Sequence, residues 1–479
     1  MRRIAFVLGL VGGLVSLAAW FAGRRVEEQY HVLLMGAEGV PGLALATPRY
    51  ERGLFHSELV TVIEPVAIEP DGAAWPADSA PPEPAVSAGT VRIVLHHVVS
   101  HGPYPPSWLR SEDFDGAPIL AHVVTSPTLE IETAEALEEI VLPLAFESRF
   151  TRADGGMIRL RPDPARTDFE DPELDGDWTE LEARLDFAYD GARFDGLLEV
   201  PRIVFDGEAG ALRIADLFYR FAYERVGEAL AQPLYVGGSQ LRLGALVVEA
   251  EGERFELRDL EIEDTSDVAD ESWSLQVKGS LDRVGGDETR LGPAELDYRM
   301  AGLALEPLAE LGALVANLED ENVDSAAVKA EAMGALGALW PRFMAAGPEL
   351  EVRRFRLFTP DGEIRMALRV AVDASEPALL KHPLMTLPAL EVDAELALPE
   401  KLVEHRLAAS SPSLENPPIG LAGPDGPPWF AAAATANRSL EDWLARGLVE
   451  RHGGSYVLSV RMRRGALRLN GRVVSLDAL

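Results

Sequence analysis

The residues whose spacing comes nearest to a known ligand site form an acidic run over residues 171–182. Carboxylates occupy its first, third, fifth, seventh and twelfth positions, and Gly176 occupies the sixth. This order resembles an EF-hand loop, in which alternate carboxylates converge on calcium and the glycine permits a sharp bend. The third residue is Glu173, however, and the flanks are proline-rich or strand-like where an EF-hand needs helices. We interpret the run as a solvated acidic loop, with calcium binding as the alternative.

Histidines form the second candidate group. His96, His97 and His101 lie in or beside one predicted strand, and His122 lies near the next. Imidazoles on adjacent strands can bind a transition metal. Alternation along a strand places His96 and His97 on opposite faces, however, and His101 falls at the turn. We therefore expect half-buried or turn histidines and predict no metal site.

Nucleophile and cofactor motifs are missing from the sequence. Residues 237–241 contain Ser239 but lack the second glycine of a nucleophile elbow, and a strand follows where that motif needs a helix. The sequence contains no P-loop, dinucleotide fingerprint or HExxH motif. It has no cysteine, which excludes thiol nucleophiles, disulfides and cysteine-bound zinc. We predict no catalytic residue, no cofactor and no enzyme activity, and keep a hydrolase as a minor alternative.

The charge of the chain limits its partners. Its 479 residues include 44 Lys and Arg against 78 Asp and Glu, a net charge of −34. Such a surface repels the phosphate backbone of nucleic acid. The apolar fraction of 47% is that of a chain with an ordinary hydrophobic core. We therefore expect a folded protein that does not bind nucleic acid.

The N-terminus carries a long apolar run. Residues 4–22 contain no charged side chain, and a helix of this length rises about 28 Å, close to the ~30 Å hydrocarbon core of a bilayer. We predict a transmembrane signal-anchor over residues 1–23, with residues 4–22 in the lipid bilayer. The alternative is a cleaved signal peptide, for which residues 16–18 offer small side chains. Both interpretations place the remaining chain across the membrane.

Most of the remaining chain alternates with a period of two, as strands do. One apolar face per strand indicates antiparallel sheet, and Asp-Gly turns separate several strands. Helical periodicity marks residues 212–230, 303–318 and 323–344, and a helix that Ser439 caps and Gly453-Gly454 terminates. The predicted fold class is α+β, with long antiparallel sheets and a few amphipathic helices. We expect one domain over residues 24–479, with mobile proline-rich loops at 71–89 and 410–428.

Several short phrases occur in a fixed order along the chain. They are Gly23-Arg24-Arg25-Val26-Glu27, Tyr50-Glu51-Arg52-Gly53-Leu54-Phe55-His56-Ser57, His101-Gly102-Pro103, Leu291-Gly292-Pro293-Ala294-Glu295-Leu296, Pro348-Glu349-Leu350, Thr359-Pro360-Asp361-Gly362-Glu363 and Leu467-Arg468-Leu469-Asn470-Gly471. In this order they resemble the YdgA-like family of bacterial proteins, a domain-of-unknown-function family. The resemblance implies an inner-membrane anchor with the body of the chain in the periplasm. It implies no established activity, so no catalytic residue is carried over, and the loops at 71–89 and 410–428 depart from it as insertions.

The amphipathic strands and helices supply more apolar surface than a compact catalytic domain requires. From this we expect a single-pass envelope protein with a non-catalytic interaction or assembly role in the periplasm. The alternative is that part of the sheet stays open as an apolar groove for a lipid or another hydrophobic ligand.

Overall fold

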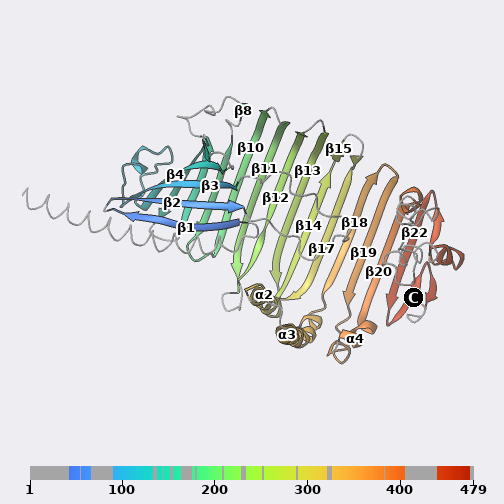
Figure 1. The fold of residues 1–479 in the computed structure, drawn as a ribbon. Helices are drawn as coiled ribbons and strands as arrows, with labels where there is room; N and C mark the ends of the chain where they lie inside the picture. Colours follow the sequence, from blue (N-terminus) through green and yellow to red (C-terminus); the bar gives the residue numbers. More distant parts are fainter. Residues whose placement is uncertain are drawn as a thin grey trace, which may run out of the picture. The chain divides into compact units, whose positions relative to one another are not determined.

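The computed structural model places most of the described chain in antiparallel strands (Figure 1). The chain divides into two compact units, residues 1–222 and 223–479. The residues that the structure describes are 43–53, 55–65, 90–132, 137–142, 144–151, 155–162, 175–177, 181–207, 210–227, 233–250, 253–286, 290–320, 326–381, 383–404 and 440–474.

The first unit contains an antiparallel sheet whose strands pair largely in chain order. β1, β2, β3, β4, β6, β7, β9 and β10 follow one another, while β5 pairs with β4 and β8 with β10. The bounds are β1 Leu43–Arg52, β2 His56–Pro65, β3 Thr90–His101, β4 Ile119–Glu132, β5 Leu137–Val141, β6 Leu144–Thr151, β7 Gly155–Pro162, β8 Asp175–Asp177, β9 Glu182–Ala188 and β10 Arg193–Gly207, with the 3₁₀ turn η1 at Trp108–Arg110.

One face of this first sheet is buried, as its strand alternation predicts. In β3, His97 and Val99 are buried. The alternate residues His96 and Val98 are exposed. The residues that form the hydrophobic core of this face are Val99, Ala121, Val123, Phe150 and Phe187.

The helix predicted over residues 212–230 is wrong, because β11 (Gly210–Val226) is a strand. The boundary between the two units falls within it. Asp216 has a left-handed backbone conformation with φ 54°, which interrupts the alternation of the strand. Exposed residues therefore recur at Arg213, Asp216 and Arg220, a spacing of three and four that imitates a helix.

The second unit contains a wide antiparallel sheet, whose strands lie side by side in Figure 1. Its strands pair in the order β12, β13, β14, β17, β18, β19, β20, β22, β23 and β24, with β15 on β13, β16 on β15 and β21 on β22. The bounds are β12 Leu234–Ala250, β13 Glu253–Ala269, β14 Ser272–Leu281, β15 Arg283–Gly286, β16 Arg290–Leu291, β17 Ala294–Ala304, β18 Glu349–Thr359, β19 Gly362–Val372, β20 Leu390–Pro399, β21 Glu450–His452, β22 Ser455–Arg463, β23 Ala466–Leu469 and β24 Arg472–Val474.

The helices predicted near residues 303–318 and 323–344 are confirmed as α2 (Leu305–Asp320) and α3 (Ala326–Ala345). They occupy the connection between β17 and β18. The connection between β19 and β20 contains η2 (Leu379–Lys381), α4 (Pro383–Thr386) and η3 (Leu387–Ala389). The antiparallel register puts both connections at the same end of the sheet, where Figure 1 shows α2, α3 and α4.

The predicted helix near residue 440 exists at residues 440–445, but its predicted end is wrong. The helix closes at Gly447, which has φ 65° and donates its backbone N–H to the carbonyl of Leu444. Gly453 and Gly454 instead form the turn between β21 and β22.

Several predictions fall outside the described residues. These are the signal-anchor over residues 1–23 and the loops at 71–89 and 410–428. Among the helices that the structure describes, none has the length and apolar character needed to cross a bilayer.

Candidate functional site

The second unit presents a continuous apolar face, formed where directly paired residues of neighbouring strands point to the same side. One row of these pairs crosses eight strands, which at a strand spacing of about 4.8 Å spans about 34 Å. The row consists of Leu241, Ile262, Gly279, Leu296, Phe355, Met366, Leu396 and Leu458.

Two neighbouring rows continue this apolar face over β14 to β22. Their members pair across the same strands, so together the three rows form a band rather than a single line. The rows are Val277, Tyr298, Val352, Leu368, Ala394 and Val460, and Leu275, Met300, Leu350, Val370, Val392 and Met462.

A β-bulge keeps the apolar face intact where the sequence breaks its period. In β18, Val352 pairs with Leu368 and Phe355 with Met366, so two residues of β18 stand opposite Ala367 alone. The extra residue lets both Val352 and Phe355 reach the apolar face.

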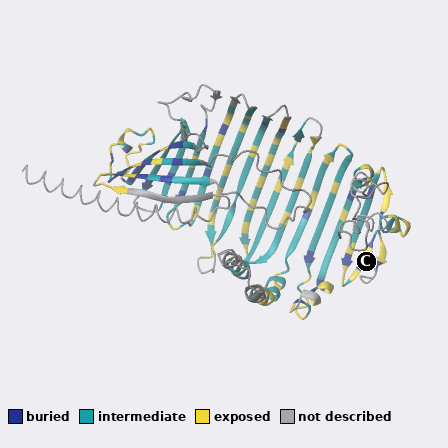
Figure 2. Cartoon of the chain, in the orientation of Figure 1, coloured by how far each residue is buried: buried dark blue, intermediate teal, exposed yellow. Residues whose placement is uncertain are grey.

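The apolar face is only partly covered. Its side chains in β14 to β20 are mostly half-buried, and Leu296 is 36% exposed. By contrast, Leu59 and Val99 on the buried face of the first unit are 1% exposed. Figure 2 shows this difference between the two units in colour.

One edge of the face is closed by the C-terminal segment of the described chain. Leu448 and the partly buried Trp443 pack there against side chains of β20, β22, β23 and β24. The buried cluster consists of Leu448, Met462, Leu467, Leu469 and Val474. The helices α2, α3 and α4 lie at the strand ends, so no helix among the described elements runs across the middle of the face.

The opposite face of the same sheet carries ion pairs between strands. Arg369 Nε lies 2.5 Å from Glu349 Oε1, and its Nη1 lies 3.5 Å from Glu391 Oε2. Arg463 likewise pairs with Glu391 and Asp393, at 2.8 Å each. The sheet thus has one charged face that favours water and one apolar face that does not.

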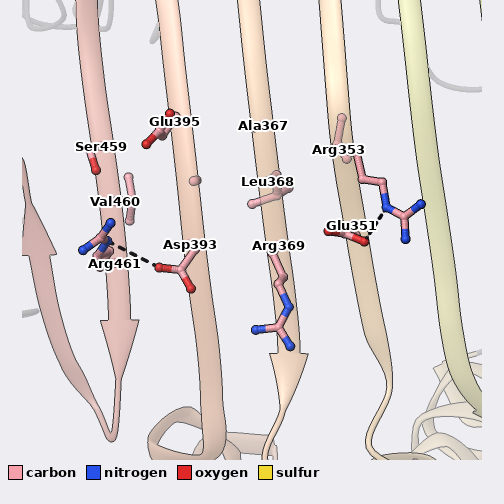
Figure 3. Close-up of a pocket in the computed structure, with 12 residues that line it drawn as sticks. Glu351, Arg353, Ala367, Leu368, Arg369, Asp393, Glu395, Ser459, Val460 and Arg461 are labelled. Carbon is pink, nitrogen blue, oxygen red and sulfur yellow. Dashed lines mark hydrogen bonds and ion pairs between the residues drawn. The ribbon is translucent and has the colours of Figure 1, made fainter.

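A hollow on the charged face crosses β18, β19, β20 and β22 (Figure 3). Two ion pairs lie within it: Arg353 Nε is 2.8 Å from Glu351 Oε2, and Arg461 Nε is 3.5 Å from Asp393 Oδ1. Small side chains, Ala367 and Ser459, make room between them. Arg369, which also lines the hollow, pairs with Glu349 and Glu391 outside it.

The histidines of the first unit do not converge on one point. His97 and His101 lie on the buried face, His96 is exposed on the opposite face, and His122 lies on that opposite face too. Among the residues that the structure describes, no group of three or more His, Asp or Glu side chains is arranged to hold a metal ion.

Two of these histidines form buried hydrogen bonds with hydroxyl groups. Ser57 Oγ lies 2.7 Å from His101 Nε2, and both side chains are 3% exposed or less. His97 lies between Thr125 (Nδ1 to Oγ1, 2.7 Å) and Thr61 (Nε2 to Oγ1, 3.1 Å). Burial lowers the pKa of each imidazole to about 4, aided by the charge of neighbouring basic groups. These hydrogen bonds link β3 to its neighbours β2 and β4.

On the other face of the first sheet, the loop after β3 covers a row of arginines. Trp108 is 1% exposed, its ring centroid lies 5.7 Å from that of His122, and the guanidinium of Arg149 lies 5.3 Å from it. Acidic residues of the same loop pair with arginines of β6 and β7, such as Asp115 with Arg149 at 3.0 Å. These contacts explain why the loop packs closely on the sheet.

Glu147 lies beneath that loop. The imidazole of His122, 3.6 Å away, and the guanidinium of Arg161 lower the pKa of Glu147 to about 2. Ser111 also donates a hydrogen bond to it at 3.0 Å. The Glu147 carboxylate therefore stays ionised and serves as a structural centre for the loop.

The predicted EF-hand loop is only partly described. Asp175–Asp177, which would supply its central residues, form β8 and pair with residues 204–206 of β10. Glu182, its twelfth residue, lies 2.9 Å from Arg159 Nη2. A strand and an ion pair thus occupy two parts of the loop where calcium binding needs a bend and a free carboxylate.

Comparison with known proteins identifies a family. Residues 1–477 match the family described as bacterial protein of unknown function (DUF945). The chain belongs to this family. No characterised protein and no protein of solved structure shows significant similarity to it. The family description assigns no activity, and the narrower YdgA-like name stays an expectation from the sequence phrases.

Sequence reasoning located only part of the site in this DUF945 chain. The alternating apolar residues of β14 and β22 were visible in the sequence, but their alignment into rows depends on pairing across eight strands. The contacts of Trp108 with His122 and Arg149 were not anticipated. A lone tryptophan beside acidic residues 112, 113 and 115 was the one signal available.

Proposed function

We propose that this chain is a non-catalytic envelope protein that binds lipid acyl chains on the apolar face of its second unit. The observation that carries this proposal is the half-buried apolar band across β14 to β20. Acyl chains gain about 25 cal/mol for each Å² of apolar surface removed from water, and the band offers a long continuous surface for that gain.

A membrane anchor would hold the apolar face close to the lipids that it binds. We propose that residues 4–22 anchor the chain in the bacterial inner membrane and that the body lies in the periplasm. Lipids have very low solubility in water, so a binding face held near the bilayer exchanges them over a short path. The charged face of the same sheet, with Arg369, Arg461 and their carboxylate partners, keeps the protein hydrated outside the membrane.

The chemistry of the apolar band favours a lipid over a protein partner. A protein interface carries about one hydrogen bond per 100–200 Å². Between β14 and β20 the three rows offer the Tyr298 hydroxyl as their one polar side-chain group, and it lies 3.6 Å from Met300 Sδ within the same face. An interaction or assembly role with another envelope protein is the competing outcome of the test below.

The test is lipid analysis of the full chain, extracted from membranes in a mild detergent and purified. Organic extraction and mass spectrometry should find bound lipid in stoichiometric amount. Met366→Glu, on the apolar face, should lose most of this lipid, whereas Arg365→Glu, its neighbour on the charged face, should keep it. Both variants keep the same anchor and the lipid around it. A difference in the amount of bound lipid between them therefore measures binding on the sheet. Equal lipid in both variants, with one envelope protein co-purifying, would instead support the assembly role.

A further inference from the structure

One of the three apolar rows, the row that contains Val277, ends in a polar group on β13. Asp264 of β13 points to this face, because it pairs with Val277 of β14 in the same row as Tyr298 and Val352. Its other neighbour across the strands is Ser239 of β12. The apolar row therefore begins at Val277 and has a half-buried carboxylate at its end.

The oxygens of Asp264 are held in place by hydroxyl groups. Tyr223 donates a hydrogen bond to Oδ2 at 3.0 Å, and Ser239 donates one to Oδ1. These neutral donors orient the carboxylate and leave its negative charge in place. Each carboxylate oxygen retains capacity for a further hydrogen bond.

No cation of the described chain lies within ion-pair distance of Asp264, in contrast with the carboxylates on the other face. Glu261, three residues earlier in the same strand, is 3.3 Å from Arg242 Nε. Lys278 of β14 is paired in register with Glu263 and therefore also lies on the charged face. A half-buried carboxylate without a positive partner is unfavourable on its own and is stabilised by an incoming cation.

We propose that the second unit binds amphiphiles with a positively charged amine head group, whose ammonium pairs with Asp264 while the acyl chain lies along the apolar face. This rests on the lipid binding proposed above and adds the head-group chemistry. The acyl chain points from Asp264 toward β14, since Val277, Tyr298 and Val352 continue the row on that side and Ser239 ends it on the other.

The test compares two lipids with one acyl chain and different heads, lysophosphatidylethanolamine and lysophosphatidylglycerol, by calorimetry on the purified full chain. Wild type should bind the ethanolamine lipid roughly five- to tenfold more tightly, as expected for one partly desolvated charge pair. This preference should shrink at high salt, because the pair is partly exposed.

The variant Asp264→Asn keeps the shape of the side chain and removes its charge. It should bind both lipids with similar affinity, while Glu263→Gln, the neighbouring carboxylate on the charged face, should keep the wild-type preference. A wild type without preference, or a preference that survives in Asp264→Asn, would overturn the head-group proposal and leave acyl binding standing. If the folded wild type binds neither lipid, the proposed function itself fails.

Discussion

Val352 of β18 lies directly opposite Leu368 of β19, and the adjacent residues Glu351 and Arg369 lie opposite each other on the reverse side of the sheet. One step along each strand thus changes the surface from apolar to charged. The same alternation holds in β20, where Ala394 pairs with Leu368 and Asp393 pairs with Arg369. A sheet built this way separates an apolar band from a charged face.

Truncating Trp108 should detach the loop that covers the first sheet. Trp108→Ala removes a side chain that is 1% exposed and contacts His122 and Arg149, so unfolding of this unit should become easier by about 3–5 kcal/mol. Hydrogen exchange of β4 and β6 amides measures this. Leu109→Ala, next to it but 50% exposed, should change protection by less than about 0.5 kcal/mol. Similar losses in both variants would contradict the described packing.

The first unit should lose stability as the pH falls from 6.5 to 4. His97 and His101 have a folded-state pKa of about 4, below the usual 6.5, so in this window the unfolded chain binds protons that the folded chain does not. Within this window each histidine lowers the free energy of unfolding by about 1.4 kcal/mol per pH unit. Above pH 6.5 neither histidine changes it with pH.

Hydrogen exchange of β3 amides as a function of pH measures that slope. His97→Gln should reduce the slope by about half, because His101 remains. His452→Gln, an exposed histidine of the second unit, should leave it unchanged. A stability that is flat between pH 6.5 and 4 would show that the two imidazoles are not buried in neutral form.

Asn470 should be required for the closed edge of the apolar face. Its Oδ1 accepts a hydrogen bond from the Ser459 amide at 2.7 Å, and its Nδ2 donates to the carbonyls of Leu448 (3.0 Å) and Val457 (3.1 Å). It also has φ 45°, a conformation that asparagine tolerates better than most residues.

Asn470→Ala should therefore lower the free energy of unfolding by about 2–4 kcal/mol, since backbone groups lose their partners. Urea unfolding followed by tryptophan fluorescence provides the measurement. The exposed Arg468→Ala, two residues away, serves as control and should stay within about 0.5 kcal/mol of wild type. If Asn470→Ala matched that control, the three hydrogen bonds would not support this edge.

The sequence predicted local structure well where alternation is regular and less well where bulges interrupt it. Trp273, Leu275 and Val277 alternate cleanly, and their strand was recognised. β11 was mistaken for a helix, because Asp216 in a left-handed conformation shifts its exposed residues to helical spacing.

The rest of the site could not be predicted from the sequence, because it depends on contacts between segments that are distant along the chain. Asp264 meets the Tyr223 hydroxyl 41 residues away and the Ser239 hydroxyl 25 residues away. No local pattern marks such a pair, because each residue alone is an ordinary polar residue of a strand. The apolar face itself was anticipated as an alternative, yet which residues line it follows from the strand register.

The most direct test of acyl-chain binding is photocrosslinking with a phospholipid that carries a diazirine in its acyl chain, followed by mapping of labelled residues in β19. Binding on the apolar face predicts labels at Ile364, Met366, Leu368 and Val370 and none at the intervening Arg365, Ala367 and Arg369. This alternation by one residue is specific to one side of the sheet. Labels on the intervening residues, or no label in β14 to β20 while the anchor region is labelled, would contradict the account.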